Sequence, residues 1–155
     1  MSNNYKIAVL SLGGNIGDKE ENFKKVKQII PQKIGEITQL SSIHQSQAWG
    51  FESSDIFFNQ VVVVNTQLEP EELLFTIWEI ERMFGRQRAS AQEELKKYND
   101  RLSSERPIYH SRAMDIDILY YNNQTISTEL LKIPHPHIKD REFILKPLGE
   151  ISDYF

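Results

Sequence analysis

The feature that most constrains the fold is an alternating stretch, Arg112-Ala-Met-Asp-Ile-Asp-Ile-Leu119. Met114, Ile116 and Ile118 occupy one parity, and Asp115 and Asp117 occupy the other. A period of two is typical of a β-strand, so both carboxylates should project from one face while the apolar residues enter a core. Aspartate is uncommon in strands. The pair indicates either a solvated sheet face or a Mg²⁺ site completed by substrate phosphates, for which the Arg112 guanidinium is a suitable neighbour.

Composition narrows the class of protein. The chain has 155 residues, of which 39% are hydrophobic and 26% charged, as expected for one globular domain over residues 1–155. Its net charge of -4 argues against bulk binding of nucleic acid. The absence of cysteine excludes disulfides and thiolate zinc sites. No apolar run approaches the roughly 20 residues of a membrane span, so we expect a cytoplasmic protein with no membrane partner.

The first half of the chain predicts a strand, a helix and a weaker strand. A strand over residues 6–12 runs into a glycine-rich turn over residues 13–17, whose spacing fits neither common phosphate-binding loop. We therefore expect a tight turn that could also form a wall of a site. Asp18 begins a helix that Pro31 should stop, and alternation within residues 34–45 favours a strand.

The second half completes a recognisable order of elements. A buried strand over residues 61–64 follows Asn59, and a helix should begin near Pro70 and end at Gly85. The alternating stretch supplies the last strand. The order strand, helix, strand, strand, helix, strand predicts an α+β fold. The architecture expected is a ferredoxin-like split βαβ sandwich, with a mostly antiparallel sheet and helices on one face.

Several polar residues outside the aspartate pair are candidates for a site, each with a simpler alternative. Asn59 is a candidate for hydrogen-bonding the polar edge of a heterocycle, and the simpler alternative is an ordinary turn asparagine. Arg86 and Arg88 form either an anion clamp or surface charges favoured by a helix end. The polar connection over residues 89–107 predicts a mobile lid, because connections of that length are often lids or disordered. The His135-Pro-His137 pair favours proton donation or phosphate contact over zinc, which usually takes three or four ligands.

Six segments then occur in a characteristic order: Leu12–Gly17, Phe58-Asn59, Gly85–Arg88, Arg112–Leu119, Ile133–His135 and Arg141–Phe143. Together they resemble the 6-hydroxymethyl-7,8-dihydropterin pyrophosphokinase family of folate biosynthesis. The resemblance implies transfer of pyrophosphate from ATP to the hydroxymethyl group of the pterin, giving AMP and the pterin diphosphate. It also implies action on small molecules. Because the sequence ends at Phe155 with no fused dihydropteroate synthase or aldolase domain, we expect a monofunctional chain, and we expect a monomer.

The resemblance implies roles by matching position. Asp115 and Asp117 would bind two Mg²⁺ ions, and they would share catalysis with Arg86, Arg88 and Arg112. The residues implied for ATP are Glu81, Arg86, Arg112, Ile118, His135 and Arg141. The residues implied for the pterin are Ser46, Ala48, Gly50, Phe57, Asn59, Tyr109 and Phe143.

Two other functions share parts of this pattern. A different Mg²⁺-dependent nucleotidyl or phosphoryl transferase would keep the paired aspartates but not the aromatic slot, and pterin-dependent turnover would separate the two. A regulatory module that binds a small ligand could use the same fold. Such a module would bind its ligand without consuming ATP.

Overall fold

The computed structural model describes residues 4–47, 56–85 and 112–151. The expected lid over residues 89–107 lies outside this part of the chain. So do five of the predicted site residues, namely Ala48, Gly50, Arg86, Arg88 and Tyr109. Their predicted roles therefore stay predictions.

An antiparallel sheet forms the centre of the molecule. Its strands are β1 (Lys6–Gly14), β2 (Gly35–Leu40), β3 (His44–Gln47), β4 (Ile56–Thr66) and β5 (Asp115–Tyr121). They run in the order β2-β4-β1-β5, and β3 pairs with β4 beyond the end of β2. The other elements are α1 (Lys19–Lys33), α2 (Pro70–Met83), α4 (Glu142–Leu148) and a small hairpin of β6 (Ile126–Ser127) and β7 (Lys132–Ile133).

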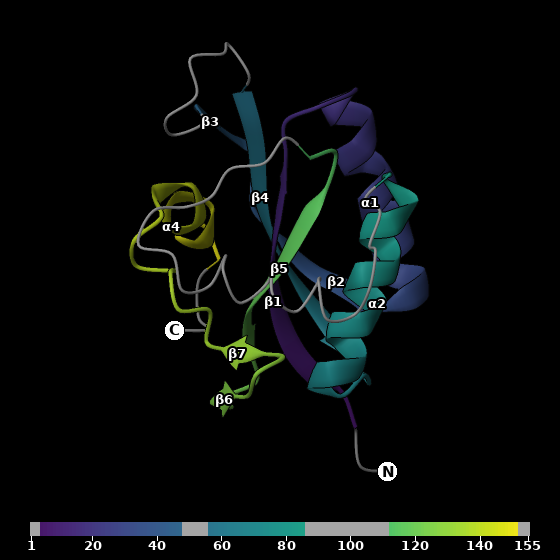
Figure 1. Cartoon of the computed structure of the whole chain (residues 1–155), viewed down its shortest axis with the longest axis vertical. Coiled ribbons are helices and arrows are strands. Elements are labelled where there is room, and N and C mark those ends of the chain that lie inside the picture. The colour runs from purple at the N-terminus through teal and green to yellow at the C-terminus, as the bar shows by residue number, and fades with distance from the viewer. Residues whose placement is uncertain (1–3, 48–55, 86–111, 152–155) are drawn as a thin grey trace.

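Two layers of apolar side chains pack on opposite faces of the sheet. Figure 1 shows α1 and α2 against one face and α4 against the other. The α+β prediction is confirmed, but the expectation that helices cover only one face is wrong for α4. The reason is the parity of the buried strands. Val61 and Val63 point away from α1 and α2, and Ile144 and Leu148 of α4 cover them.

The first helix begins where the sequence predicts and ends slightly later. The Asp18 side chain accepts a hydrogen bond from the Glu21 N–H at 3.1 Å, which satisfies one free donor of the first turn. Pro31 was expected to stop the helix, yet α1 continues to Lys33. In the last turn a proline removes only one backbone bond, and the Ile34 N–H still donates to the Ile30 carbonyl at 2.8 Å.

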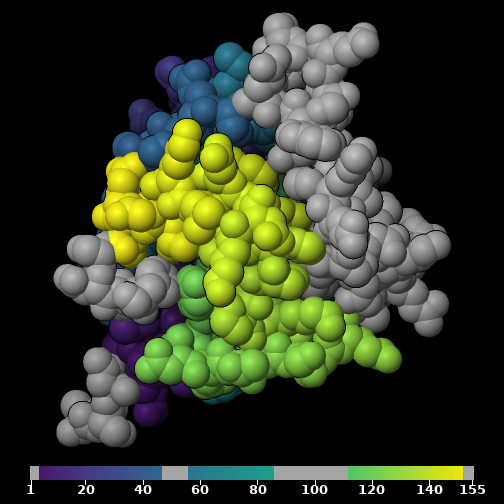
Figure 2. All heavy atoms as spheres, turned by 90° about the vertical axis from the view of Figure 1, so that its left-hand side faces the viewer, coloured from purple at the N-terminus to yellow at the C-terminus, as the bar shows by residue number. Residues whose placement is uncertain are grey.

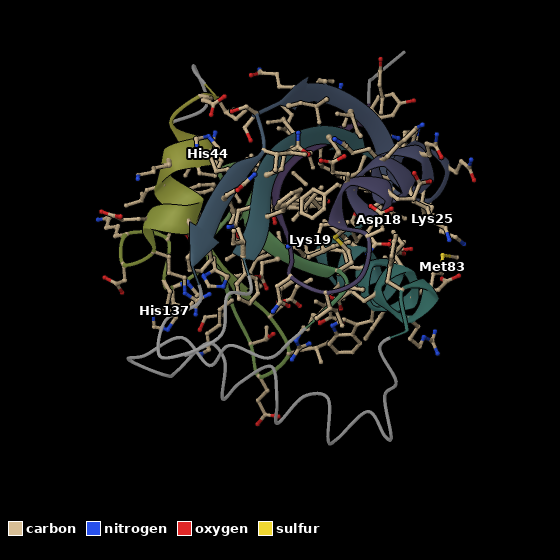
Figure 3. All side chains as sticks on the ribbon, turned by 90° about the horizontal axis from the view of Figure 1, so that it is seen from above. Asp18, Lys19, Lys25, His44, Met83 and His137 are labelled. Carbon is tan, nitrogen blue, oxygen red and sulfur yellow. The ribbon has the colours of Figure 1, made fainter. Side chains whose placement is uncertain are left out.

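The face that carries α4 also carries a polar latch, formed by Ser42, His44 and Glu150. The Glu150 carboxylate accepts from the Ser42 N–H at 2.9 Å and the Ser42 hydroxyl at 2.8 Å, and it contacts His44 Nε2. Figure 3 shows His44 lying beside α4. These bonds lower the pKa of Glu150 to about 2, chiefly through the Ser42 N–H. The latch therefore connects the residues just after α4 to the segment between β2 and β3.

We expect Glu150→Gln to reduce the free energy of unfolding at neutral pH, because the charged acceptor of the latch is lost. The folded-state pKa lies below the ordinary value of 4.5, so this stabilisation exists above that value and disappears as the pH falls toward about 2. Urea unfolding at several pH values measures it. The two proteins should become equally stable at the acid end. Glu129→Gln, at an exposed position, is the control, and a pH-independent difference would contradict the linkage.

Candidate active site

The two aspartates of β5 project from the sheet face that carries α4. Their neighbours Met114, Ile116 and Ile118 are 1%, 3% and 4% exposed, in the core between the sheet and the helices α1 and α2. The predicted alternation is therefore confirmed. The Asp115 side chain remains 25% exposed, so its carboxylate is partly accessible to solvent.

Strand pairing brings the aspartates into line with the predicted pterin residues. Asp115 lies opposite Gly13 on β1, and Gly13 lies opposite Asn59 on β4. Neighbouring strands are about 4.8 Å apart, so Asn59 and Asp115 are separated by about 10 Å across the glycine. Because Gly13 has no side chain, the surface between them is open backbone. In the next row Ser11 lies opposite Asp117. We call Asn59, Gly13 and Asp115 the cross-strand row.

The predicted pterin residues in the described part of the chain gather at one end of this row. Asn59 is 4% exposed and its Nδ2 donates to the Ser46 hydroxyl at 2.8 Å. Ser46 lies opposite Phe57, which is two residues before Asn59 on β4. The side chains of Ser46, Phe57 and Asn59 therefore project from the same sheet face as the aspartates. A Cβ built on Gly13 would lie 3.5 Å from Asn59 Oδ1, which places that oxygen above the open backbone.

Basic side chains lie at the other end of the row and beside it. Arg112 Nη1 is 3.7 Å from Asp115 Oδ1. His135 is 4% exposed. Its backbone N–H donates to the Leu119 carbonyl at 3.0 Å, which attaches the segment to β5, the strand of the aspartates. Its Nδ1 accepts from the His137 N–H at 3.1 Å, so the proton of the neutral ring lies on Nε2.

The other predicted phosphate and pterin residues lie at the start of α4. Arg141 is 6% exposed and its Cζ is 5.7 Å from the centre of the Phe143 ring. Phe143 also packs against the core cluster of this face. Figure 2 shows that the chain from the β6–β7 hairpin to α4 forms a continuous surface on this side of the molecule. This segment leads into α4, which packs on the sheet face from which the aspartates project.

Comparison with known proteins identifies the family. A profile of the 7,8-dihydro-6-hydroxymethylpterin-pyrophosphokinase (HPPK) family matches residues 9–153. The chain belongs to this family. The 2-amino-4-hydroxy-6-hydroxymethyldihydropteridine pyrophosphokinase of Aquifex aeolicus is 37% identical over 143 residues, which are 92% of this chain and 78% of the relative. That of Bacillus subtilis is 35% identical over 146 residues, which are 94% and 77%.

Solved structures support the pyrophosphokinase fold. The HPPK-DHPS of Plasmodium falciparum with pteroate superposes with a TM-score of 0.67 at 16% identity, covering 94% of this chain. An HPPK-DHPS in complex with substrates gives a TM-score of 0.70 at 17% identity, covering 95% of this chain. The chain spans about two fifths of the length of these bifunctional chains, 40% in both cases.

Two residues predicted for ATP lie inside the pyrophosphokinase core. Ile118 is buried between the sheet and the helices α1 and α2, on the face opposite the aspartates, so only its main chain could meet a ligand there. Glu81 was expected to face the nucleotide end. It is 1% exposed, and its Oε2 accepts from the Ile116 N–H at 3.0 Å. Its carboxylate thus supports the backbone between the two aspartates.

Sequence reasoning did not single out Ser11, and it gave Gly13 only as part of a turn that could form a wall of a site. Ser11 is 6% exposed and lies opposite Asp117, and Gly13 is the open centre of the row. Their positions depend on register, which no local pattern reveals. The glycine-rich turn after β1 was the available signal, because a strand that ends in two glycines can bring its backbone close to a neighbour or ligand.

Proposed function

We propose that the cross-strand row is the active site for pyrophosphoryl transfer from ATP to 6-hydroxymethyl-7,8-dihydropterin. This reaction belongs to the HPPK family, in folate biosynthesis, and ATP is the co-substrate. The observation that carries the assignment is the alignment of Asn59 with Asp115 across Gly13. One side of the row suits a polar heterocycle and the other suits a metal-bound phosphate.

We infer that Asp115 and Asp117 would hold Mg²⁺. Both are carboxylates on one sheet face, which fits the hard oxygen ligands that this ion takes in protein sites. In the described part of the chain no cluster of three or more acidic or histidine side chains could hold a metal, so substrate phosphates and water would complete its shell. Two bound ions would supply neutralisation of phosphate charge. Ser11, beside Asp117, offers a further oxygen.

The pterin would lie at the Asn59 end of the row. A pterin has a flat ring with a donor- and acceptor-rich amide edge, which matches an amide side chain flanked by aromatic rings. Asn59 would bind that edge, held in place by Ser46. Phe57 and Phe143 would cover the ring. Ala48, Gly50 and Tyr109 would complete this side of the site.

The cationic residues would bind and orient the triphosphate. Arg112 lies beside Asp115, and His135 and Arg141 belong to the C-terminal segment on the same side. Arg86 and Arg88 are further candidates. As the β-phosphorus passes to the pterin oxygen, negative charge moves onto the departing AMP, and fixed cations stabilise that charge. Positioning and charge stabilisation account for most of the catalysis in such transfers.

The biological setting of the pyrophosphokinase is also proposed. No helix within residues 4–47, 56–85 and 112–151 has the length and apolar character needed to cross a membrane. We propose a cytoplasmic monomer of one domain over residues 1–155, which acts on small molecules. A lid over residues 89–107 would cover the bound nucleotide.

The test is AMP formation from Mg-ATP with and without 6-hydroxymethyl-7,8-dihydropterin. We expect AMP only with the pterin, and none from Asp115→Ala, whose pterin binding by calorimetry should remain. Removing Mg²⁺ with a chelator should abolish turnover, and adding excess Mg²⁺ should restore it. No pterin-dependent AMP from folded protein would contradict the proposal, and a screen of other acceptors would then address a different nucleotide-using transferase.

A further inference from the structure

The two residues that follow β1, Asn15 and Ile16, contact the main chain of Arg112. Asn15 is 4% exposed. Its Oδ1 accepts from the Arg112 N–H at 2.8 Å, and its own N–H donates to the Arg112 carbonyl at 2.8 Å. The Ile16 N–H reaches the same carbonyl at 3.4 Å. Both backbone polar groups of Arg112 are therefore held by one buried residue.

Gly14 permits this close approach. A Cβ built on Gly14 would lie 2.4 Å from the Ala113 carbonyl oxygen, which is backbone and cannot move aside cheaply. The regular pairing of β1 and β5 reaches only Gly13 and Asp115. Beyond that point the Asn15 carboxamide takes the place of a strand neighbour. The contact extends the pairing of the two chains past the end of the sheet.

The contact lies next to the proposed site. Arg112 is three residues from Asp115, and their side chains approach to 3.7 Å. A backbone held on both sides restricts where the guanidinium can point, and it also fixes the start of the strand that carries the aspartates. A long arginine side chain otherwise loses considerable conformational freedom when it binds a phosphate.

We propose that Asn15 is a positioning residue for the triphosphate side of the reaction, acting through the main chain of Arg112. This inference rests on the proposed site. The hydrogen bonds from Asn15 set the direction of the Arg112 guanidinium and the position of Asp115 before the nucleotide arrives. The pterin end of the row, at Asn59, is held by Ser46 and does not depend on them.

The variants separate this role from general stability. Asn15→Ala removes the acceptor of the Arg112 N–H, and Asn15→Asp keeps an oxygen acceptor at the same reach. Asn22→Ala is the matched control, because the Asn22 amide contacts the same turn at the Ile16 carbonyl, 3.4 Å away, but not Arg112. Should Asn15→Ala not fold, Asn15→Ser replaces it, since its hydroxyl is one bond shorter.

Two measurements need no turnover. Amide hydrogen exchange at Arg112 should accelerate in Asn15→Ala and return toward wild type in Asn15→Asp. The affinity for the Mg²⁺ complex of the non-cleavable α,β-methylene analogue of ATP should fall about 10- to 100-fold in Asn15→Ala. A loss of this size is typical when a residue that supports a metal site is removed. Pterin affinity should stay within about threefold, the usual range for a site that loses no contact. Asn22→Ala should match wild type in both.

Steady-state kinetics complete the test. In Asn15→Ala we expect a loss in kcat/KM for Mg-ATP that exceeds any loss in kcat/KM for the pterin. Unchanged exchange at Arg112, or equal losses for nucleotide and pterin, would overturn the proposal. If the wild-type chain made no AMP with the pterin, the proposed function would fail, while exchange and analogue binding would still judge the role of Asn15.

Discussion

Replacing Asp117 with asparagine is expected to reduce turnover by about 100-fold or more, because removal of a main electrostatic contact at a reacting centre typically costs that much. The variant keeps the shape of the side chain. The residue lies on the face of β5 that carries α4, and its neighbours Ile116 and Ile118 lie in the core on the other face. Stability and pterin affinity should therefore change little, while the Mg²⁺ concentration needed for half-maximal activity should rise.

Turnover at increasing Mg²⁺, with pterin binding by calorimetry, measures this. Asp18→Asn is the matched control, because asparagine caps a helix about as well as aspartate and Asp18 caps α1 away from the row. Turnover of Asp117→Asn within about threefold of wild type would contradict the metal assignment, since a lost ligand should cost far more.

Replacing Glu81 with alanine is expected to reduce both stability and activity. The Glu81 carboxylate is 1% exposed and accepts from the Ile116 N–H at 3.0 Å. Without this carboxylate, the buried Ile116 N–H loses the acceptor described above, which costs about 1–3 kcal/mol of stability. The removed side chain also leaves a cavity in the core. The β5 backbone should loosen where both carboxylates depend on it. Glu81→Gln keeps an acceptor and should retain most of the stability.

Urea unfolding separates this structural role from direct nucleotide contact. Glu79→Ala, on the same helix, removes an exposed ion pair with Lys33 at 3.0 Å, and such pairs contribute about 0–1 kcal/mol. It should therefore resemble wild type. If Glu81→Ala unfolded at the wild-type urea concentration but bound Mg-ATP more weakly, Glu81 would act on the nucleotide rather than on β5.

Local patterns predicted the elements well where one physical cause dominated. The alternation over residues 112–119 correctly placed apolar residues in a core and aspartates on the other face, because side chains alternate along any strand. Asp18 marked the start of α1 for a similarly local reason. The prediction that the helix ends at Pro31 was wrong, because the cost of a proline in a helix depends on how many helical residues follow it.

Other features depend on contacts between distant segments. The extension of β1 through Gly14 requires β4 as a partner, and the position of α4 depends on which valines of β4 remain uncovered. The resemblance implied that Glu81 contacts ATP, but the glutamate is 1% exposed. Its hydrogen bond to Ile116 joins residues that the sequence places far apart.

By itself, the sequence determined the chemistry available to this protein: paired carboxylates on one strand face, an amide beside aromatic rings, and several cations. It also carried the resemblance to the pyrophosphokinase family. Only the tertiary structure decided that Asn59 and Asp115 align in register on either side of Gly13, and that Asn15 binds the main chain of Arg112. The reason is register. A shift of one residue in strand pairing would turn every side chain to the other face, and long-range packing alone selects the alignment.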